Sequence, residues 1–367
     1  MKTLALTRSC WFRRRQGRWG RLSLCREAAL TLVAALVVAV ALTAASAAAY
    51  GPVTLHYYGK LGPHRVQMEI TIDEEKVTGT YWHDSVGRKL LLEGTFKART
   101  VDMAEINESG EVTGRWRGGL NPIAGWWEGT WTSADGQQTL EFDLQLVAEI
   151  VRTSEKRLGC VDVEVIRPVL MPALLTGKVD PAQRWIDSVA FLPVDAIVIE
   201  RLAEPTFEPE MPWSNYYLSV EYRIAHFSPR LLSVEGTIYS YTGGAHGSYV
   251  AVPYTIVPGP SGPVEVQLED VFLPGSGWEE KLADYVIGDL REQGAAWVVT
   301  GEVTEVAVES LHRFTLSPAG IRFYFDPYEM GPWVEGMYTV DVPWTELAGM
   351  VNLDGPAGTV VPQASGE

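Results

Sequence analysis

The stretch Val77-Thr78-Gly79-Thr80-Tyr81 is repeated, with changes, 35 residues later as Val112-Thr113-Gly114-Arg115-Trp116. Two further pairs of segments keep this offset: Val66-Gln67-Met68 with Val101-Asp102-Met103, and Leu92-Glu93-Gly94-Thr95-Phe96 with Trp127-Glu128-Gly129-Thr130-Trp131. A fixed internal period indicates a repeated structural unit. Each unit contains three short runs in which apolar and polar residues alternate between turn residues, as in antiparallel strands. We therefore predict an all-β domain over residues 50–148, in which repeated three-strand units give seven strands in a small barrel or sandwich.

Tryptophan is concentrated in this repeat, and two interpretations of it are open. The residues are Trp82, Trp116, Trp126, Trp127 and Trp131. Alternate indole rings can fill the core of a small β domain, whereas exposed rings would form a platform that stacks on sugar rings. Neighbouring residues of a strand point to opposite faces. One of the adjacent pair Trp126 and Trp127 therefore faces outward, and that one is a candidate contact residue.

Residues 155–352 show a different pattern, in which strand-like runs are interrupted by two helices. Asp180-Pro181-Ala182-Gln183 combines an N-cap residue with proline at the first helical position. Ser276-Gly277-Trp278-Glu279 has the spacing of a capping box, and Gly294 ends the apolar period that follows it. We predict an α+β domain with an antiparallel sheet and about two helices. The remaining predicted segments are a linker of mixed charge, 149–158, and a flexible tail, 353–367.

The composition excludes several classes of protein. Of the 367 residues, 46% are apolar and 21% are charged, which excludes disorder of the whole chain. The formal net charge is −16. A nucleic-acid partner is excluded on this ground, because binding it requires a basic surface.

Residues 1–49 have the order of a secretory signal peptide. Eight basic side chains and one acidic one precede the apolar run 28–45, and small residues follow it. Cleavage after Ala47 or Ala49 would leave a chain of net charge −23, whereas an uncleaved run would anchor the chain in the membrane. Both alternatives predict that residues 50–367 are extracytoplasmic and reach the membrane only through the uncleaved segment.

The sequence offers no recognised catalytic or cofactor-binding motif. Its six histidines lack metal-ligand spacing, and nucleophile-elbow, P-loop and dinucleotide-binding motifs are absent. Cys160 is the only cysteine after residue 49, so an intramolecular disulfide is excluded there, and we interpret it as a small buried residue. We therefore predict no catalytic residue, no metal and no cofactor.

Two stretches of the second domain, rich in glycine and aromatic residues, resemble a known family. One is Tyr241-Thr242-Gly243-Gly244-Ala245-His246-Gly247-Ser248-Tyr249, and the other is Gly320-Ile321-Arg322-Phe323-Tyr324-Phe325-Asp326-Pro327-Tyr328-Glu329. Together with Phe314-Thr315-Leu316, Gly336 and Val342-Pro343-Trp344-Thr345-Glu346-Leu347, they look like the extracytoplasmic domain of RsiV-type anti-sigma factors. That domain also accompanies the catalytic domain of some cell-wall polysaccharide deacetylases. The resemblance covers roughly residues 155–350.

This resemblance implies a receptor, because the best-known member of the family binds lysozyme, a basic protein. The acidity of the chain agrees with such a partner. Two features depart from the family. At most 27 residues would be cytoplasmic, too few for a sigma-binding domain, and the Asp and His metal site of a deacetylase has no counterpart. A binding module is what remains.

Candidate contact residues gather on the glycine-histidine turn and on the tyrosine-rich strand. His246 lies in a turn where Gly243 and Gly244 permit positive φ, so it either contacts a partner or satisfies the turn backbone. Tyr324 alternates with two phenylalanines, and Tyr328 either fills a pocket or anchors an interface. The full set of candidate partner-binding residues is Tyr241, Gly243, Gly244, His246, Tyr249, Tyr324, Tyr328, Trp126 and Trp127.

The function these observations favour is that of an exported, non-enzymatic binding protein of the cell envelope. Its expected partner is a basic wall-active protein such as lysozyme, or a cell-wall glycan. Two alternatives stay open. One is a cell-wall-active enzyme, deacetylase-like or a hydrolase, with a dispersed site, and the other is a structural envelope protein.

Overall fold

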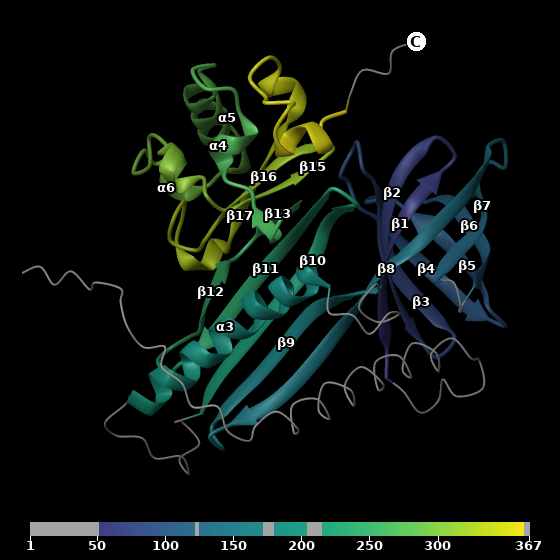
Figure 1. Cartoon of the computed structure of the whole chain (residues 1–367), viewed down its shortest axis with the longest axis horizontal. Coiled ribbons are helices and arrows are strands. Elements are labelled where there is room, and N and C mark those ends of the chain that lie inside the picture. The colour runs from purple at the N-terminus through teal and green to yellow at the C-terminus, as the bar shows by residue number, and fades with distance from the viewer. Residues whose placement is uncertain (1–50, 122–124, 172–179, 204–214, 363–367) are drawn as a thin grey trace, which may run out of the picture.

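The computed structural model describes residues 51–121, 125–171, 180–203 and 215–362. The predicted export segment, 1–49, lies outside these residues. Figure 1 shows a barrel at the N-terminal end and a larger part in which long strands are followed by a smaller sheet with helices. The described helices do not include one that is both long enough and apolar enough to cross a membrane.

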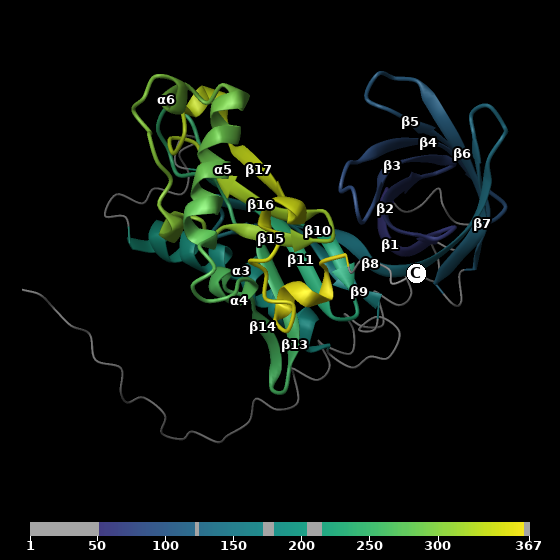
Figure 2. The ribbon, with the colours of Figure 1, turned by 90° about the horizontal axis from the view of Figure 1, so that it is seen from above.

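Eight strands close the N-terminal barrel. They are β1 (Val53–Leu61), β2 (His64–Asp73), β3 (Lys76–His83), β4 (Leu90–Lys97), β5 (Thr100–Ile106), β6 (Val112–Asn121), β7 (Trp126–Ser133) and β8 (Thr139–Arg157). Each strand pairs antiparallel with the next, and β1 also pairs with β8, which closes the ring seen in Figure 2. The predicted all-β class is confirmed as a barrel. The predicted number of seven strands is wrong, because the predicted strands begin at Val66 and leave out β1, which lies 35 residues before β4 but shares only two identical residues with it, Leu55 with Leu90 and Gly59 with Gly94.

The barrel core explains the repeated Val-Thr-Gly segments. Trp116, Trp127, Tyr57 and Tyr81 are among its largest fully buried side chains. A Cβ atom on Gly79 would overlap the carbonyl oxygen of Glu69 on the neighbouring strand, so glycine lets the two strands approach. Indole rings therefore fill a narrow interior, the first of the two interpretations of the tryptophan repeat.

Strand β8 continues out of the barrel and joins it to the rest of the chain. Its last ten residues pair with β9 (Val161–Leu170), from the Ala148–Leu170 pair to the Arg157–Val161 pair. The linker predicted over residues 149–158 is therefore mostly strand. Mixed charge suggested a loop there, but the charged side chains at this end of β8 are exposed in a solvated strand.

A long sheet and one helix follow. Strand β9 pairs with β10 (Tyr216–Ser228), and the further strands are β11 (Leu231–Tyr241), β12 (Ser248–Ala251), β13 (Tyr254–Gly259) and β14 (Gly262–Glu265). The β9–β10 pair is parallel, an exception to the predicted antiparallel sheet. Parallel neighbours need a crossover connection, and helix α3 (Pro181–Ala203) lies in it. As predicted, this helix begins at Pro181, and Asp180 Oδ1 accepts a hydrogen bond of 2.7 Å from Ala182 N.

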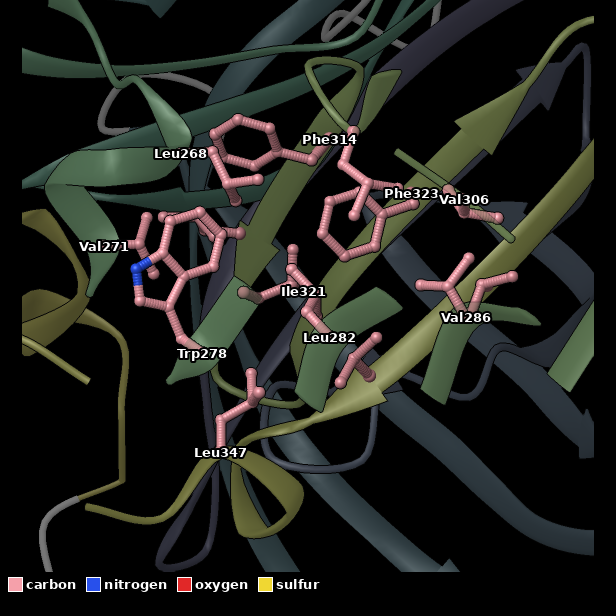
Figure 3. Packing of buried hydrophobic residues seen from close by; sticks show 14 of the residues in the cluster. Leu268, Val271, Trp278, Leu282, Val286, Val306, Phe314, Ile321, Phe323 and Leu347 are labelled. Atoms are coloured by element: carbon pink, nitrogen blue, oxygen red, sulfur yellow. The ribbon is translucent and has the colours of Figure 1, made fainter. Parts of the chain in front are cut away.

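The C-terminal part is a three-stranded antiparallel sheet covered by a helix. The strands are β15 (Phe314–Ser317), β16 (Gly320–Phe325) and β17 (Tyr338–Pro343), and the main helix is α5 (Trp278–Gln293). Shorter elements are α4 (Leu268–Val271), α6 (Ala296–Val299), η3 (Val308–Ser310), η4 (Trp333–Glu335), η5 (Trp344–Leu347) and η6 (Pro356–Thr359). In Figure 3 the apolar face of α5, with Trp278, Leu282 and Val286, meets Phe323 and Ile321 of the sheet. The α+β character of this domain is confirmed.

The two ends of α5 differ from each other in how well the sequence predicts them. Gly294 ends the helix in the left-handed conformation, as predicted. The predicted capping box is wrong, because the N-cap is Gly277, with φ 79°, and no side chain caps the helix. Ser276 Oγ is buried instead, with no hydrogen-bond partner among the described residues.

Candidate partner-binding site

The glycine-histidine turn connects β11 to β12 and carries His246 on the surface. Gly243 and Gly244 have φ values of 106° and 91°, a region that disfavours other residues. The hydroxyl of Tyr241 donates to the carbonyl of Gly244 across the turn at 3.1 Å. His246 is exposed, and its Nδ1 lies 2.9 Å from the carbonyl oxygen of Gly247. The turn therefore holds the imidazole in one place while leaving it accessible.

His246 and Tyr249 meet on the indole ring of Trp333. The rings of His246 and Trp333 stack, with centroids 4.5 Å apart and planes inclined by 29°. Tyr249 approaches the same indole by its edge at 6.0 Å. Gly336 adopts φ 81°, and a Cβ there would lie 3.2 Å from the Tyr249 hydroxyl. The two stretches that carry the resemblance thus lie side by side in the structure.

Sequence reasoning missed Trp333, although it is the centre of this cluster. The residue sits in η4, between the tyrosine-rich stretch and Gly336, where no strand or helix pattern marks it. Its Nε1 is buried with no hydrogen-bond partner among the described residues. The sequence signal that could have indicated Trp333 is its position two residues after Gly331, in a segment with no strand or helix periodicity.

Tyr328 stands on the turn that follows β16, in an unfavourable backbone conformation. It has φ 70°, and 55% of its surface is exposed. Asp326 Oδ1 accepts from Ala251 N at 2.7 Å, and Arg313 pairs with Asp326 at 2.9 Å and with Glu329. A left-handed conformation costs a non-glycine residue about 1–2 kcal/mol. Such strain persists where the surroundings enforce it, and it concentrates at functional sites.

We call the contacting side chains of His246, Tyr249 and Trp333, together with the exposed Tyr328 on the turn that precedes Trp333 in the chain, the aromatic surface. Burial raises the pKa of Asp326, two residues before Tyr328, while the hydrogen bond from Ala251 and the charge of Arg313 lower it. The surrounding region, 269–345, holds fourteen acidic and four basic side chains, a net charge of −10. In the barrel, residues 51–148 hold fourteen acidic and nine basic side chains, a net charge of −5. Tyr328 and Trp333 of the aromatic surface therefore belong to the more acidic region, which can attract a basic partner.

Tyr324 is placed differently from the other candidate residues. Only 7% of it is exposed, and its side chain reaches Glu235 of β11 in the other sheet. Its hydroxyl donates to Glu235 Oε2 at 3.3 Å and lies 3.2 Å from Thr315 Oγ1. Burial, and then the Glu235 carboxylate, raise the pKa of this hydroxyl well above its usual range. Tyr324 joins two sheets, so it does not form part of the aromatic surface.

The two adjacent tryptophans of the barrel divide as the strand geometry requires. Trp127 is fully buried, with Tyr57 and Phe142 at ring-centroid distances of 5.8 and 5.1 Å. Trp126 is half-buried at the start of β7, and Figure 1 shows β7 in the barrel, away from β12. The structure therefore does not bring either of them to the aromatic surface.

The part of the chain that the structure describes has no group of three or more His, Cys, Asp or Glu side chains that could hold a metal ion. Cys160 is a buried free cysteine. The arrangement at the aromatic surface presents aromatic rings and carboxylates, which suit recognition of a partner.

Comparison with known proteins identifies the C-terminal region. Residues 269–345 match the family described as "Protein of unknown function (DUF3298)". A stretch of 128 residues is 24% identical to peptidoglycan-N-acetylmuramic acid deacetylase PdaC of Bacillus subtilis (strain 168). This match covers 34% of the present chain and 27% of that enzyme, so the chain spans about a quarter of its relative's length. The resemblance is thus supported as a DUF3298 domain and a distant relation to PdaC, and RsiV-type anti-sigma factors are not singled out.

Two solved structures described as DUF3298 family proteins are also similar to this chain. A DUF3298 protein from Pseudomonas aeruginosa PAO1 has a TM-score of 0.40 and 15% identity, covering 56% of this chain and 94% of that one. A DUF3298 protein from Bacteroides fragilis NCTC 9343 has a TM-score of 0.32 and 18% identity, covering 56% of this chain and 92% of that one.

Proposed function

We propose that this chain is an extracytoplasmic binding protein of the cell envelope, and that it engages a basic wall-active protein such as lysozyme through the aromatic surface. The observation that carries the proposal is Tyr328, an exposed tyrosine at positive φ between Asp326 and Glu329, which both pair with Arg313. Exposed aromatic side chains on a rigid support are the usual anchors of protein interfaces.

Two further observations support the location and the kind of partner. The relative PdaC is named for its action on peptidoglycan, and residues 1–49 have the order of an export signal. Three of the four basic side chains in 269–345 form ion pairs with carboxylates: Lys281 with Glu346, Arg313 with Asp326, and Arg322 with Asp341. The unpaired charge of this region is therefore almost entirely negative.

A cell-wall glycan is the less favoured ligand of the aromatic surface. Sugar rings stack on the open face of an indole. One face of Trp333 is already covered by His246 at 4.5 Å, so a sugar ring cannot lie there. A cationic side chain from a protein partner can instead approach the surface between Tyr328 and the carboxylates around it.

Titration of the purified protein with a basic lysozyme at near-physiological salt tests the proposal. An unrelated protein of similar positive charge is the control for the partner. We expect submicromolar affinity for the lysozyme alone, and a roughly ten- to hundredfold loss in Tyr328→Ala. Equal, weak binding of both proteins that fades with salt would overturn the proposal, and wall glycans would then be tested.

The similarity to PdaC also favours a second candidate, a cell-wall-active enzyme with a dispersed site. The test is release of acetate or of glycan fragments from purified peptidoglycan, with divalent metal and with a chelator. Turnover by the protein would support this candidate over a purely binding role, and its absence in both conditions would exclude it.

A further inference from the structure

A cluster of buried polar side chains lies where the barrel meets β10. His56 of β1 and Gln67 of β2 come from the outer wall of the barrel, Asp84 follows β3, and His226 comes from β10. None of the four exceeds 5% exposure. We call these four residues the polar joint. Barrel-wall residues that point outward are usually polar and solvated, so complete burial here means that β10 covers them.

Hydrogen bonds connect all four members of the polar joint through Gln67. His56 Nε2 lies 3.0 Å from Gln67 Oε1, which accepts its proton. Gln67 Nε2 lies 3.0 Å from Asp84 Oδ1, 2.9 Å from the carbonyl oxygen of Phe227 and 3.1 Å from His226 Nδ1. Phe227 and His226 belong to β10, so Gln67 ties the barrel wall to that strand.

The surroundings of His56 would not stabilise a positive charge on its ring after protonation of Nδ1. Nδ1 is buried and has no hydrogen-bond partner among the described residues. The nearest carboxylate, Glu69, is 4.0 Å away and is already paired with Arg223 at 3.1 Å. The charged and titratable groups that face His56 are Glu69 from β2, Asp84 and Lys89 from the segment after β3, and His226 and Arg223 from β10.

We propose that the polar joint is a proton-sensitive latch, which holds the barrel against β10 while His56 is neutral and releases it when His56 is protonated. A proton on His56 Nδ1 would place an unpaired charge in a buried site. Water can hydrate this charge only when β10 moves away from the barrel wall, so protonation of His56 favours the separated state.

The direction of the pH dependence follows from His56. Burial lowers its pKa from 6.5 to about 4, the hydrogen bond to Gln67 opposes this, and the charges of Lys89 and His226 add to the lowering. In a separated state His56 meets water and regains its ordinary pKa, so that state binds the proton more tightly. The closed joint is therefore fully stable above about pH 6.5 and loses stability as the pH falls toward 4.

The polar joint also adjoins a contact that reaches the C-terminal sheet. Lys89 Nζ lies 3.4 Å from Glu235 Oε1 of β11, and Glu235 Oε2 accepts from Tyr324 of β16 at 3.3 Å. Release of the barrel would thus withdraw Lys89 from Glu235. This inference does not depend on which partner the aromatic surface binds.

Small-angle X-ray scattering of the purified protein from pH 7.5 to pH 4 tests the latch. Size-exclusion chromatography in line with the measurement isolates the monomer at each pH, since the sequence pI is about 4.9. We expect a reversible increase of the radius of gyration between pH 6.5 and 4 with unchanged far-ultraviolet circular dichroism. No increase down to pH 4 would overturn the proposal.

Variants test whether the joint is responsible. His56→Gln should abolish the transition, and the exposed His312→Gln should leave it unchanged. Lys89→Gln removes a positive charge that disfavours protonation of His56 and should move the midpoint to higher pH, whereas the exposed Lys97→Gln should not move it. If His56→Gln does not fold, comparison of Lys89→Gln with Lys97→Gln still tests whether the joint causes the transition. Equal midpoints in all variants would overturn the latch.

Discussion

The barrel and the DUF3298 region use aromatic residues in opposite ways. The barrel buries most of its large rings, and Trp116 and Trp127 are fully covered. The DUF3298 region and the turn beside it keep four aromatic or imidazole side chains at the surface and fix one of them in a strained conformation. Abundance of tryptophan therefore indicates a core, whereas a binding surface is indicated by rings that the fold leaves outside and braces with ion pairs.

The largest expected effect is on the barrel side of this comparison. Trp127→Ala removes a fully buried indole between Tyr57 and Phe142 and should lower the free energy of unfolding by about 3–5 kcal/mol. Urea unfolding followed by circular dichroism measures this loss. Trp126→Ala is the matched control, and it should cost clearly less because its ring is already partly in water. Similar losses in both variants would contradict the assignment of Trp127 to the barrel core and Trp126 to its outer wall.

A smaller effect is expected from the ion pairs beneath Tyr328. Arg313→Gln leaves Asp326 and Glu329 without their cation and should cost about 2–3 kcal/mol, since the guanidinium is mostly buried. Its affinity for the partner should fall as well, because the turn no longer fixes Tyr328. Arg88→Gln breaks an exposed pair with Glu108 and should change stability by less than about 1 kcal/mol. If the Arg313→Gln protein kept both its stability and its affinity, the ion pairs of Arg313 would not be what positions Tyr328 for binding.

The sequence predicts the barrel better than the site, for a physical reason. The 35-residue period and the alternation of apolar residues are local patterns, and they are sufficient for strands β2–β7 and the first part of β8. Strand β1 was missed because only Leu55 and Gly59 are identical to their counterparts in β4 at this offset. The parallel β9–β10 pair and the extension of β8 depend on pairing between distant segments, which no local pattern encodes.

The same limit applies to the candidate residues. His246 and Tyr249 were predicted and lie together, and the strand alternation correctly separates Trp126 from Trp127. Tyr324 alternates as a surface residue would, but a second sheet covers it. Trp333 was missed because only the folded chain brings η4 to the β11–β12 turn.

The smallest expected effect on stability is also the sharpest test of the aromatic surface. Tyr328→Gly and Tyr328→Ala remove the same ring, so both should lose roughly ten- to hundredfold in affinity for the partner. Only glycine relieves the strain at φ 70°, worth about 1–2 kcal/mol, against a loss of about 0.5–1 kcal/mol in backbone entropy.

The glycine variant should therefore equal or exceed the native protein in stability by up to about 1.5 kcal/mol, while the alanine variant should not gain. Thermal unfolding and titration of the same preparations measure both quantities. A variant that gains stability and loses affinity would show that the strained Tyr328 serves binding at a cost in stability. If Tyr328→Gly bound as tightly as the native chain, the strained conformation would have no role in binding. The barrel and the DUF3298 region would then differ only in how deeply they bury their aromatic side chains.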